Sequence, residues 1–319
     1  MAPAAAHQRI TLRGFEPGAF AEVIAGGRFE HTLLGPAPVS ADLEHAHAPG
    51  VVADRGSYTF ATHVRGSFDP SMLCFGTVRT HVGNAVINGR PIGPGDLQIY
   101  AEDAPLDYTA GPMTDWLGLQ LPRGDLEDAC EQAGLTAPLP ARGDRNLTLA
   151  QPDAAGLARC IDSLFADARA GDDLASARRA ITQLLVESIA RSASASARAE
   201  PSGTPQAPRL IRRALAEMRA DLSAPYDSAF LCDRVNTSER SLQLAFRRTL
   251  GISPSRCNEL LRLNAAYNAM LNASPSAESV TTIAMRFGFT HMGRFAKRYA
   301  DTFGRLPSAV LKGPPRGPR

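Results

Sequence analysis

The sequence predicts an α+β protein, in which a β-rich barrel with trailing helices precedes an all-α part that holds two helix-turn-helix units. Three observations predict this class. Short alternating runs separated by turn residues fill the chain up to residue 121, helical periodicity follows, and one motif occurs twice between residues 232 and 307. The 319 residues suffice for about two domains, and a composition of 44% hydrophobic and 21% charged residues is that of an ordinary globular protein.

The first part of the chain is expected to be a β-rich domain spanning residues 1–121. Gly, Pro, Asn and Asp punctuate its short runs at close spacing, as in an all-β barrel or sandwich. The segment Gly89–Asp96 resembles the Pro-Gly-Asp hairpin of cupins, so the predicted barrel is cupin-like. The predicted strands are Ser57–Val64, Met72–Val78, Asn84–Asn88, Asp96–Ala101, Leu106–Ala110 and Trp116–Leu121.

A helical segment spanning residues 122–191 follows the strands. One face of its last helix carries an apolar stripe from Ile181 to Ile189 at helical spacing. This stripe has two interpretations: it packs on the β domain, or it faces a partner helix in a dimer. Residues 192–208 are rich in Ser, Ala and Pro, which predicts a flexible linker. The predicted helices are Asp125–Ala133, Asp153–Arg169 and Leu174–Ala197.

The charge of the chain is divided unevenly. Residues 209–319 hold 18 basic and 8 acidic residues, a net of +10, whereas residues 1–208 carry a net of −8. A basic third attached to an acidic remainder is typical of nucleic-acid binding. The chain has no apolar run long enough to span a membrane and no apolar stretch of a signal peptide at its start. We therefore expect a cytoplasmic protein that binds duplex DNA.

Cysteine and histidine usage argues against a metal site. The five cysteines are scattered without a Cys-x-x-Cys pair. His45-x-His47, with His63 and His81 downstream, resembles part of the ligand motif of metal-binding cupins, but the expected Glu is missing. No phosphate-binding loop, dinucleotide fingerprint or Gly-x-Ser-x-Gly motif is present, so neither an enzyme nor a cofactor is expected. Two alternatives stay open: a cupin-type metalloenzyme fused to a DNA-binding module, and a front domain that only oligomerises.

The repeated motif predicts two helix-turn-helix units. In each copy a small residue, Cys232 or Ala284, is followed four positions later by Asn236 or Gly288 and then by an amphipathic helix. The small residues let two helices cross closely, and Asn and Gly tolerate the left-handed conformation of the turn. A long helix, Ser255–Leu271, separates the two copies.

The second helix of each unit, Glu239–Leu250 or Met292–Phe303, is predicted to read DNA. Each has an apolar face toward the core: Leu242, Phe246 and Leu250 in the first, and Phe295, Tyr299 and Phe303 in the second. Arg and Gln on the opposite face suit base edges in the major groove, and hydroxyls at helix N-termini suit phosphate. The predicted DNA-binding residues are Thr237, Ser238, Arg240, Gln243, Leu244, Arg247, Thr290, His291, Arg294, Lys297 and Arg298.

These motifs resemble the AraC/XylS family of bacterial transcription regulators. The resemblance covers about 100 residues, Leu210–Leu311, and rests on Ser238-x-Arg240-x-Leu242-x-x-x-Phe246-Arg247 with Gly251-x-Ser253-Pro254, and on Val280-x-x-Ile283-Ala284-x-x-x-Gly288-Phe289 with Phe295, Tyr299, Phe303-Gly304 and Pro307-Ser308. It implies a seven-helix module whose recognition helices enter successive major grooves about 34 Å apart. Base contacts would fall on Arg240 and Gln243, and near Met292, Gly293 and Lys297. The chain departs from the family at Leu244, often Arg, and at Asn236, usually Gly.

The resemblance also implies a function. The chain would be a transcription regulator, more an activator than a repressor, whose front domain binds a small-molecule effector and dimerises. An activator would contact RNA polymerase. The residues expected to line the effector cavity are Tyr58, His63, Tyr100 and Trp116.

Overall fold

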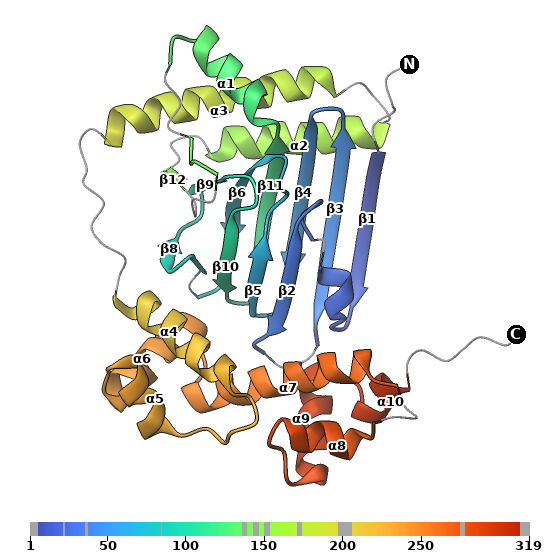
Figure 1. The fold of residues 1–319 in the computed structure, drawn as a ribbon. Helices are drawn as coiled ribbons and strands as arrows, with labels where there is room; N and C mark the ends of the chain where they lie inside the picture. The colour runs from blue at the N-terminus through green and yellow to red at the C-terminus, as the bar shows by residue number, and fades with distance from the viewer. Residues whose placement is uncertain are drawn as a thin grey trace, which may run out of the picture.

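The structure, a computed structural model, describes residues 6–21, 23–35, 38–83, 85–135, 139–142, 147–149, 154–170, 174–196, 206–274 and 278–312. These residues form two antiparallel sheets packed on each other, with helices at both ends of the strands (Figure 1). Helices α1 to α3 cross one end of the strands, and helices α4 to α10 lie at the other. Among the described helices, none is both long and apolar enough to cross a membrane.

The larger sheet has seven strands. Their order is β1 (Ala6–Arg13), β3 (Ser40–Ala48), β4 (Val51–Tyr58), β11 (Thr114–Leu121), β6 (Leu73–Thr80), β9 (Leu97–Tyr100) and β12 (Leu147–Leu149). The central strand β11 pairs with β4 through Trp116 opposite Gly56, and with β6 through Leu119 opposite Phe75. Gly56 is required here, because a Cβ at this position would meet the Trp116 ring.

The smaller sheet has the order β2 (Arg28–Leu33), β5 (Thr62–Ser67), β10 (Pro105–Ala110), β7 (Ala85–Ile87) and β8 (Arg90–Ile92). Between the described strands, no hydrogen-bonded pair joins this sheet to the larger one. The predicted β-rich domain is therefore confirmed, but it is not a closed barrel: its described strands form an open two-sheet sandwich. Closure needs a continuous ladder, and here the chain passes between the sheets by turns.

Two features of the strand prediction are wrong for identifiable reasons. The predicted strand Ser57–Val64 is two strands in different sheets, because the chain turns at residues 59–61 between β4 and β5. Phe60 at this turn is buried, so apolar alternation continues through it. Strands β1, β2 and β3 were not predicted, since their polar and histidine-rich sequences lack the expected apolar enrichment.

Helices α1 (Arg123–Gln132), α2 (Ala154–Ala170) and α3 (Ala175–Ser196) pack at one end of the strands, where they share an apolar core with the larger sheet. Ile181, Leu185 and Ile189 of the α3 stripe are fully buried in one core with apolar residues of β11 and β6. The stripe therefore packs on the β domain, which corrects the interpretation that it faces a partner helix.

The predicted linker is shorter than expected. Helix α3 continues to Ser196 and α4 begins at Gln206, so both ends of the 192–208 segment are helical. The remaining residues of this segment, 197–205, lie outside the described residues.

The carboxy-terminal part is entirely helical where the structure describes it. Its helices are α4 (Gln206–Ala220), α5 (Ser228–Val235), α6 (Glu239–Leu250), α7 (Pro254–Asn272), α8 (Val280–Arg286), α9 (Met292–Phe303) and α10 (Pro307–Leu311). Capping signals place their ends: the Ser253 hydroxyl accepts the Arg256 N–H at 3.2 Å, and Gly251 and Gly304 end α6 and α9 in the left-handed conformation. The predicted bounds of α6 and α9 are confirmed.

Helix α7, which separates the two helix-turn-helix units, lies against the lower end of the sandwich (Figure 1). The buried Asn264 side chain accepts the Leu33 N–H at 2.9 Å and donates to the Leu33 carbonyl at 3.0 Å, as a neighbouring strand would. Tyr267 donates its hydroxyl to the Phe15 carbonyl at 2.8 Å. These bonds, with the rings of Phe15 and Phe303 stacked at 6.0 Å, join the two parts of the chain.

Candidate nucleic-acid interface

The first helix-turn-helix unit consists of α5, a turn at Asn236 and the recognition helix α6. Asn236 has φ of 52°, so the residue that replaces the usual glycine adopts the left-handed conformation. Leu242 and Phe246 are fully buried, which confirms the predicted inward face of α6. On the opposite face Arg240 is exposed, as the prediction requires.

The residues of this unit that are predicted to contact DNA are all at least partly accessible to solvent. Ser238, Arg240, Leu244 and Arg247 are exposed, and Thr237 and Gln243 are half-buried. Leu244 is 45% exposed, which is unusual for a leucine and leaves its methyl groups free for an apolar contact. The Ser238 hydroxyl also caps α6 by accepting the Ser241 N–H at 3.2 Å, so part of its hydrogen-bonding capacity is already used.

The second unit consists of α8, a turn at Gly288 and the recognition helix α9. Phe295, Tyr299 and Phe303 are all buried, which confirms the predicted inward face of α9. Gly288 has φ of 72°, and a Cβ there would collide with the Ser223 carbonyl oxygen and the Arg262 guanidinium. The turn thus needs glycine for both its conformation and its close approach.

The predicted contacts of the second unit are also exposed. Thr290 and His291 lie at the N-terminus of α9, followed along its outer face by Arg294, Lys297 and Arg298. The His291 side chain makes no capping bond to α9, so the first main-chain N–H groups of the helix remain available to an anion.

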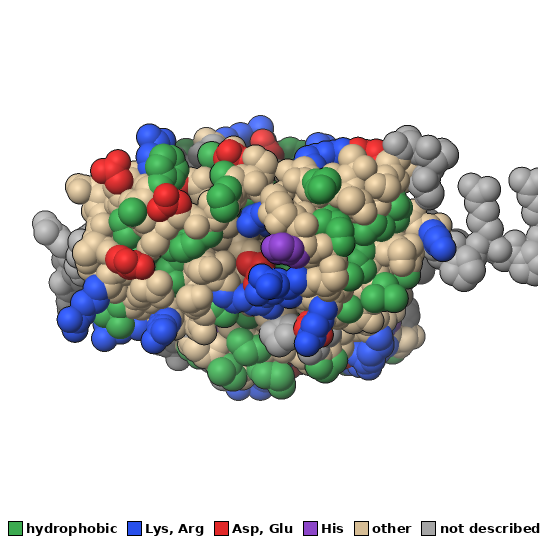
Figure 2. Space-filling view, turned by 90° about the horizontal axis from the view of Figure 1, so that it is seen from below, with side chains coloured by type: hydrophobic (Ala, Val, Ile, Leu, Met, Phe, Trp, Pro, Cys, Tyr) green, Lys and Arg blue, Asp and Glu red, His purple; other side chains and the backbone are tan. Residues whose placement is uncertain are grey.

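A groove between α7 and the second unit adds basic residues that the sequence did not single out. Figure 2 shows basic side chains gathered beside a histidine near the centre of the face that these helices form. The groove is lined mainly by residues of α7, of the turn before α9 and of α9 itself, among them Arg256, Arg262, His291, Arg294 and Arg298. A signal for Arg256 was present, since it lies in the first turn of the long helix after the Ser253-Pro254 cap.

Three of these arginines already have partners. Arg298 pairs with Glu259 of α7, which also binds Arg256 at 2.6 Å. Arg262 donates to the Phe287 carbonyl at 2.6 Å and stacks over the Phe289 ring. Arg262 therefore stabilises the second turn, while Arg298 must leave or share Glu259 to bind phosphate.

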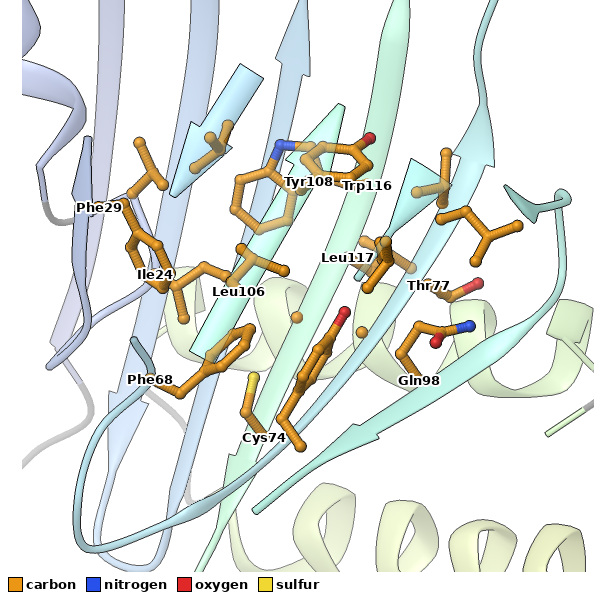
Figure 3. Close-up of a pocket in the computed structure, with 18 of the residues that line it drawn as sticks. Ile24, Phe29, Phe68, Cys74, Thr77, Gln98, Leu106, Tyr108, Trp116 and Leu117 are labelled. Atoms are coloured by element: carbon orange, nitrogen blue, oxygen red, sulfur yellow. The ribbon is translucent and has the colours of Figure 1, made fainter. Parts of the chain in front are cut away.

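A cavity between the two sheets contains three of the four residues expected to line an effector site. Tyr58, Tyr100 and Trp116 line it, together with Phe68 and Leu117 (Figure 3). The fourth expected residue, His63, does not line this cavity.

His63 instead belongs to the joint between the two parts of the chain. Its Nε2 lies 2.9 Å from Asp107 Oδ1, and Arg219 of α4 lies 2.5 Å from its Nδ1. Burial lowers the pKa of His63, and the Arg219 charge lowers it further against the opposing effect of Asp107. Because Arg219 can only donate, His63 accepts at Nδ1 and donates from Nε2 to Asp107.

The other histidines of the suspected metal motif do not converge. His45 lies 2.7 Å from Asp54, its cross-strand partner on β4, whereas His47 is exposed. In the part of the chain that the structure describes, no three His, Cys, Asp or Glu side chains are grouped as metal ligands.

Comparison with known proteins agrees with this geometry. Residues 231–313 match the helix-turn-helix domain family. Over 111 residues the chain is 40% identical to the "Probable thc operon regulatory protein" of Rhodococcus erythropolis, covering 35% of this chain and 33% of that protein. Over 74 residues it is 36% identical to XylDLEGF operon transcriptional activator 2 of Pseudomonas putida, covering 23% of this chain and 47% of that protein.

A similar solved structure is that of the AraC-like transcriptional activator CuxR, which aligns with 82% of this chain and 96% of its own at 15% identity and a TM-score of 0.42. The matches span less than half the length of the two sequence relatives. The helices of residues 231–313 are a helix-turn-helix domain of the AraC/XylS type.

Proposed function

We propose that the chain is a sequence-specific, DNA-binding transcription regulator that responds to a small molecule held in the β sandwich. One observation carries the first half of this proposal. Two helix-turn-helix units, each with a buried aromatic face and an exposed basic face, are fixed on the single helix α7. This arrangement fits two recognition helices in successive major grooves.

The division of labour follows the two parts of the chain. We assign DNA binding to residues 209–319, effector binding to residues 1–121, and a supporting role to the helices of residues 122–191. The relatives named as transcriptional activators favour activation, which would involve contact with RNA polymerase. Such a regulator would act in the cytoplasm.

We also propose a homodimer. The α3 stripe cannot form its interface, because this stripe is buried within the chain. A single chain already presents two recognition helices, so DNA binding does not require a second copy. Two chains would present four, and sedimentation of the full chain with and without DNA would distinguish these cases.

A chain of aromatic contacts gives the sandwich a route to the DNA-binding helices. Tyr58 lines the cavity, and its ring contacts Phe20 at 6.1 Å. Phe20 stacks on Phe15 at 5.6 Å, and Phe15 contacts Tyr267 of α7 and Phe303 of α9. Occupation of the cavity would therefore bear on the packing of both helices, because interiors are close-packed and transmit small displacements.

The two alternatives fit less well. A cupin-type metalloenzyme needs converging metal ligands, and the histidines of the described part of the sandwich do not provide them. A front domain that only oligomerises would not need the cavity between its sheets.

The proposal is tested by titrating the full chain into a mixed-sequence duplex at several salt concentrations. In a plot of the logarithm of the association constant against the logarithm of the salt concentration, each phosphate contact contributes about −0.9 to the slope. About five contacts therefore give a slope near −4.5. Substituting Arg294 and Lys297 together by Ala should make the slope shallower by about 2. Arg9→Ala combined with Arg90→Ala, two exposed arginines of β1 and β8, controls for the loss of two positive charges elsewhere. A slope near zero for the parent chain would show that it does not bind DNA.

A further inference from the structure

The cavity in the sandwich is large enough for a small organic molecule. Its volume is about 70 Å³, and it lies between strands of both sheets. A buried water needs about 10–15 Å³ by a comparable measure, so the space exceeds what one or two waters fill. Phe29, Phe68 and Trp116 contribute aromatic walls around it (Figure 3).

Among the residues that the structure describes, the lining of the cavity contains no charged side chain. A nearby charge is of the wrong sign for an acid: burial raises the pKa of Cys74 in the cavity wall, and the charge of the fully buried Asp54 raises it further. Asp54 is held there by His45 and by Gln120, whose amide lies at 3.1 Å. A ligand carboxylate would thus lose its hydration, find no cation and face a like charge, all of which oppose binding.

Buried polar atoms without a hydrogen-bond partner occur among the described residues of the lining, including one atom of Thr77 and one of His31. Thr77 Oγ1, on β6, and His31 Nε2, on β2, make no hydrogen bond, although both side chains are almost completely buried. Thr77 lies with Gln98 at one end of the cavity (Figure 3). Buried polar atoms are normally satisfied, so these two mark places where a bound molecule would contribute the missing hydrogen bond.

The state of His31 indicates what it would accept. Burial, reinforced by the neighbouring His63, lowers the pKa of His31 to about 3, so the ring is neutral at physiological pH. The Thr62 hydroxyl lies 3.2 Å from the Thr32 carbonyl and 3.5 Å from His31 Nδ1. Its single hydrogen goes to the closer carbonyl, so Nδ1 carries the imidazole hydrogen and Nε2 offers a lone pair.

We infer that the cavity binds an uncharged aromatic molecule that bears a hydroxyl or a similar hydrogen-bonding group, and that it rejects organic acids of the same size. The aromatic walls match the body of such a molecule, and His31 and Thr77 match its polar group. This inference rests on the proposed effector role of the sandwich and specifies the chemistry of the effector.

Trp116 makes the inference directly measurable, because it is the single tryptophan of the sequence and it lines the cavity. Its fluorescence in the full chain is followed during titration with 4-methylphenol, 4-methylbenzoate and toluene, three probes of similar size. We expect a saturable change with 4-methylphenol, at an affinity at least tenfold higher than for either of the others. Equal or tighter binding of 4-methylbenzoate, or no saturable change with 4-methylphenol, would overturn the inference.

Two substitutions test the polar contacts. Thr77→Val keeps the shape of the side chain and His31→Phe keeps an aromatic ring, while each removes the unpaired polar atom. At least one of these variants should reduce the preference for 4-methylphenol over toluene about fivefold or more. Thr80→Val, on the exposed end of the same strand, should leave the preference unchanged. If neither Thr77→Val nor His31→Phe alters it, the assigned polar contacts are wrong. DNA binding, measured separately by the salt titration, distinguishes failure of this inference from failure of the proposed function.

Discussion

At the scale of single residues, Glu44 has an environment that makes stability depend on pH. The side chain is 7% exposed and binds His7 and Arg55, each at 2.6 Å, and Arg169 at 2.5 Å. Burial alone would raise the pKa of Glu44, but these three hydrogen bonds outweigh it and lower the pKa from 4.5 to about 2. The ionised carboxylate therefore stabilises the fold fully above pH 4.5 and progressively less as the pH falls toward 2.

Glu44→Gln should lower the free energy of unfolding by about 1–3 kcal/mol at pH 7, because charge-assisted hydrogen bonds become neutral ones. The difference between variant and parent should shrink as the pH falls from 4.5 toward 2. Urea unfolding followed by Trp116 fluorescence measures both. Glu131→Gln, an exposed glutamate of α1, is the control and should match the parent at every pH. A constant difference between Glu44→Gln and the parent across this range would contradict the assignment.

Arg240 is the residue on which discrimination by the first unit should depend most. Its side chain is exposed on the outer face of α6, and a bidentate contact to guanine is worth about 1–3 kcal/mol of discrimination. Arg240→Ala should weaken binding to a selected site by that amount and binding to random duplex by much less. Competition titrations with both duplexes measure the two losses. Equal losses on the two would mean that Arg240 contacts only the backbone.

At the scale of elements, the two helix-ending glycines Gly251 and Gly288 have different structural demands. Both are left-handed, with φ of 71° and 72°, but a Cβ at Gly251 meets nothing within 4 Å, whereas at Gly288 it collides with Ser223 and Arg262. Gly251→Ala should cost about 1 kcal/mol of backbone strain. Gly288→Ala should cost about 1–3 kcal/mol more, because the turn must also shift. Thermal unfolding of the two variants compares them, and equal losses would refute the close approach.

The elements also show what the sequence could and could not predict. Helices α6 and α9 were predictable to the residue, since Ser238, Gly251 and Gly304 mark their ends and the aromatic stripes mark their faces. The early strands β1 and β3 could not be predicted from the sequence, because their conformation depends on pairing with neighbouring strands rather than on residue propensity. Strand β1 pairs with β3, and β3 with β4, over eight residue pairs each. The division into two sheets depends on turns that apolar alternation does not reveal.

At the scale of the whole molecule, the joint between sandwich and helices was beyond sequence reasoning. Asn264 and Leu33 are 231 positions apart, and no periodicity connects them. His63 was predicted to line the cavity as a polar residue of the strands, but in the structure it contacts Arg219 of a distant helix at the joint. Local patterns identify faces, whereas the partners of those faces are set by the tertiary fold.

Asn264→Ala should weaken this joint, because it leaves the buried Leu33 N–H and carbonyl unpaired. Each of these two orphaned groups costs about 1–3 kcal/mol, so a loss of about 2–6 kcal/mol is expected. Asn268→Ala, one turn further along α7 and half-buried, should cost less than about 1 kcal/mol. Calorimetry of the full chain should also show the transitions of the two parts move apart in Asn264→Ala. Melting curves that coincide for the two variants would contradict the role of Asn264.

The central claim is that one chain reads DNA with two recognition helices on a common support. Selection of bound sequences from a random duplex library by the full chain tests it most directly. Two conserved blocks should emerge with centres about 10–11 base pairs apart, one helical turn of DNA. Repeating the selection with Arg240→Ala should erode conservation in one block, and with Lys297→Ala in the other. A single block, two blocks at variable spacing, or no enrichment would contradict the account.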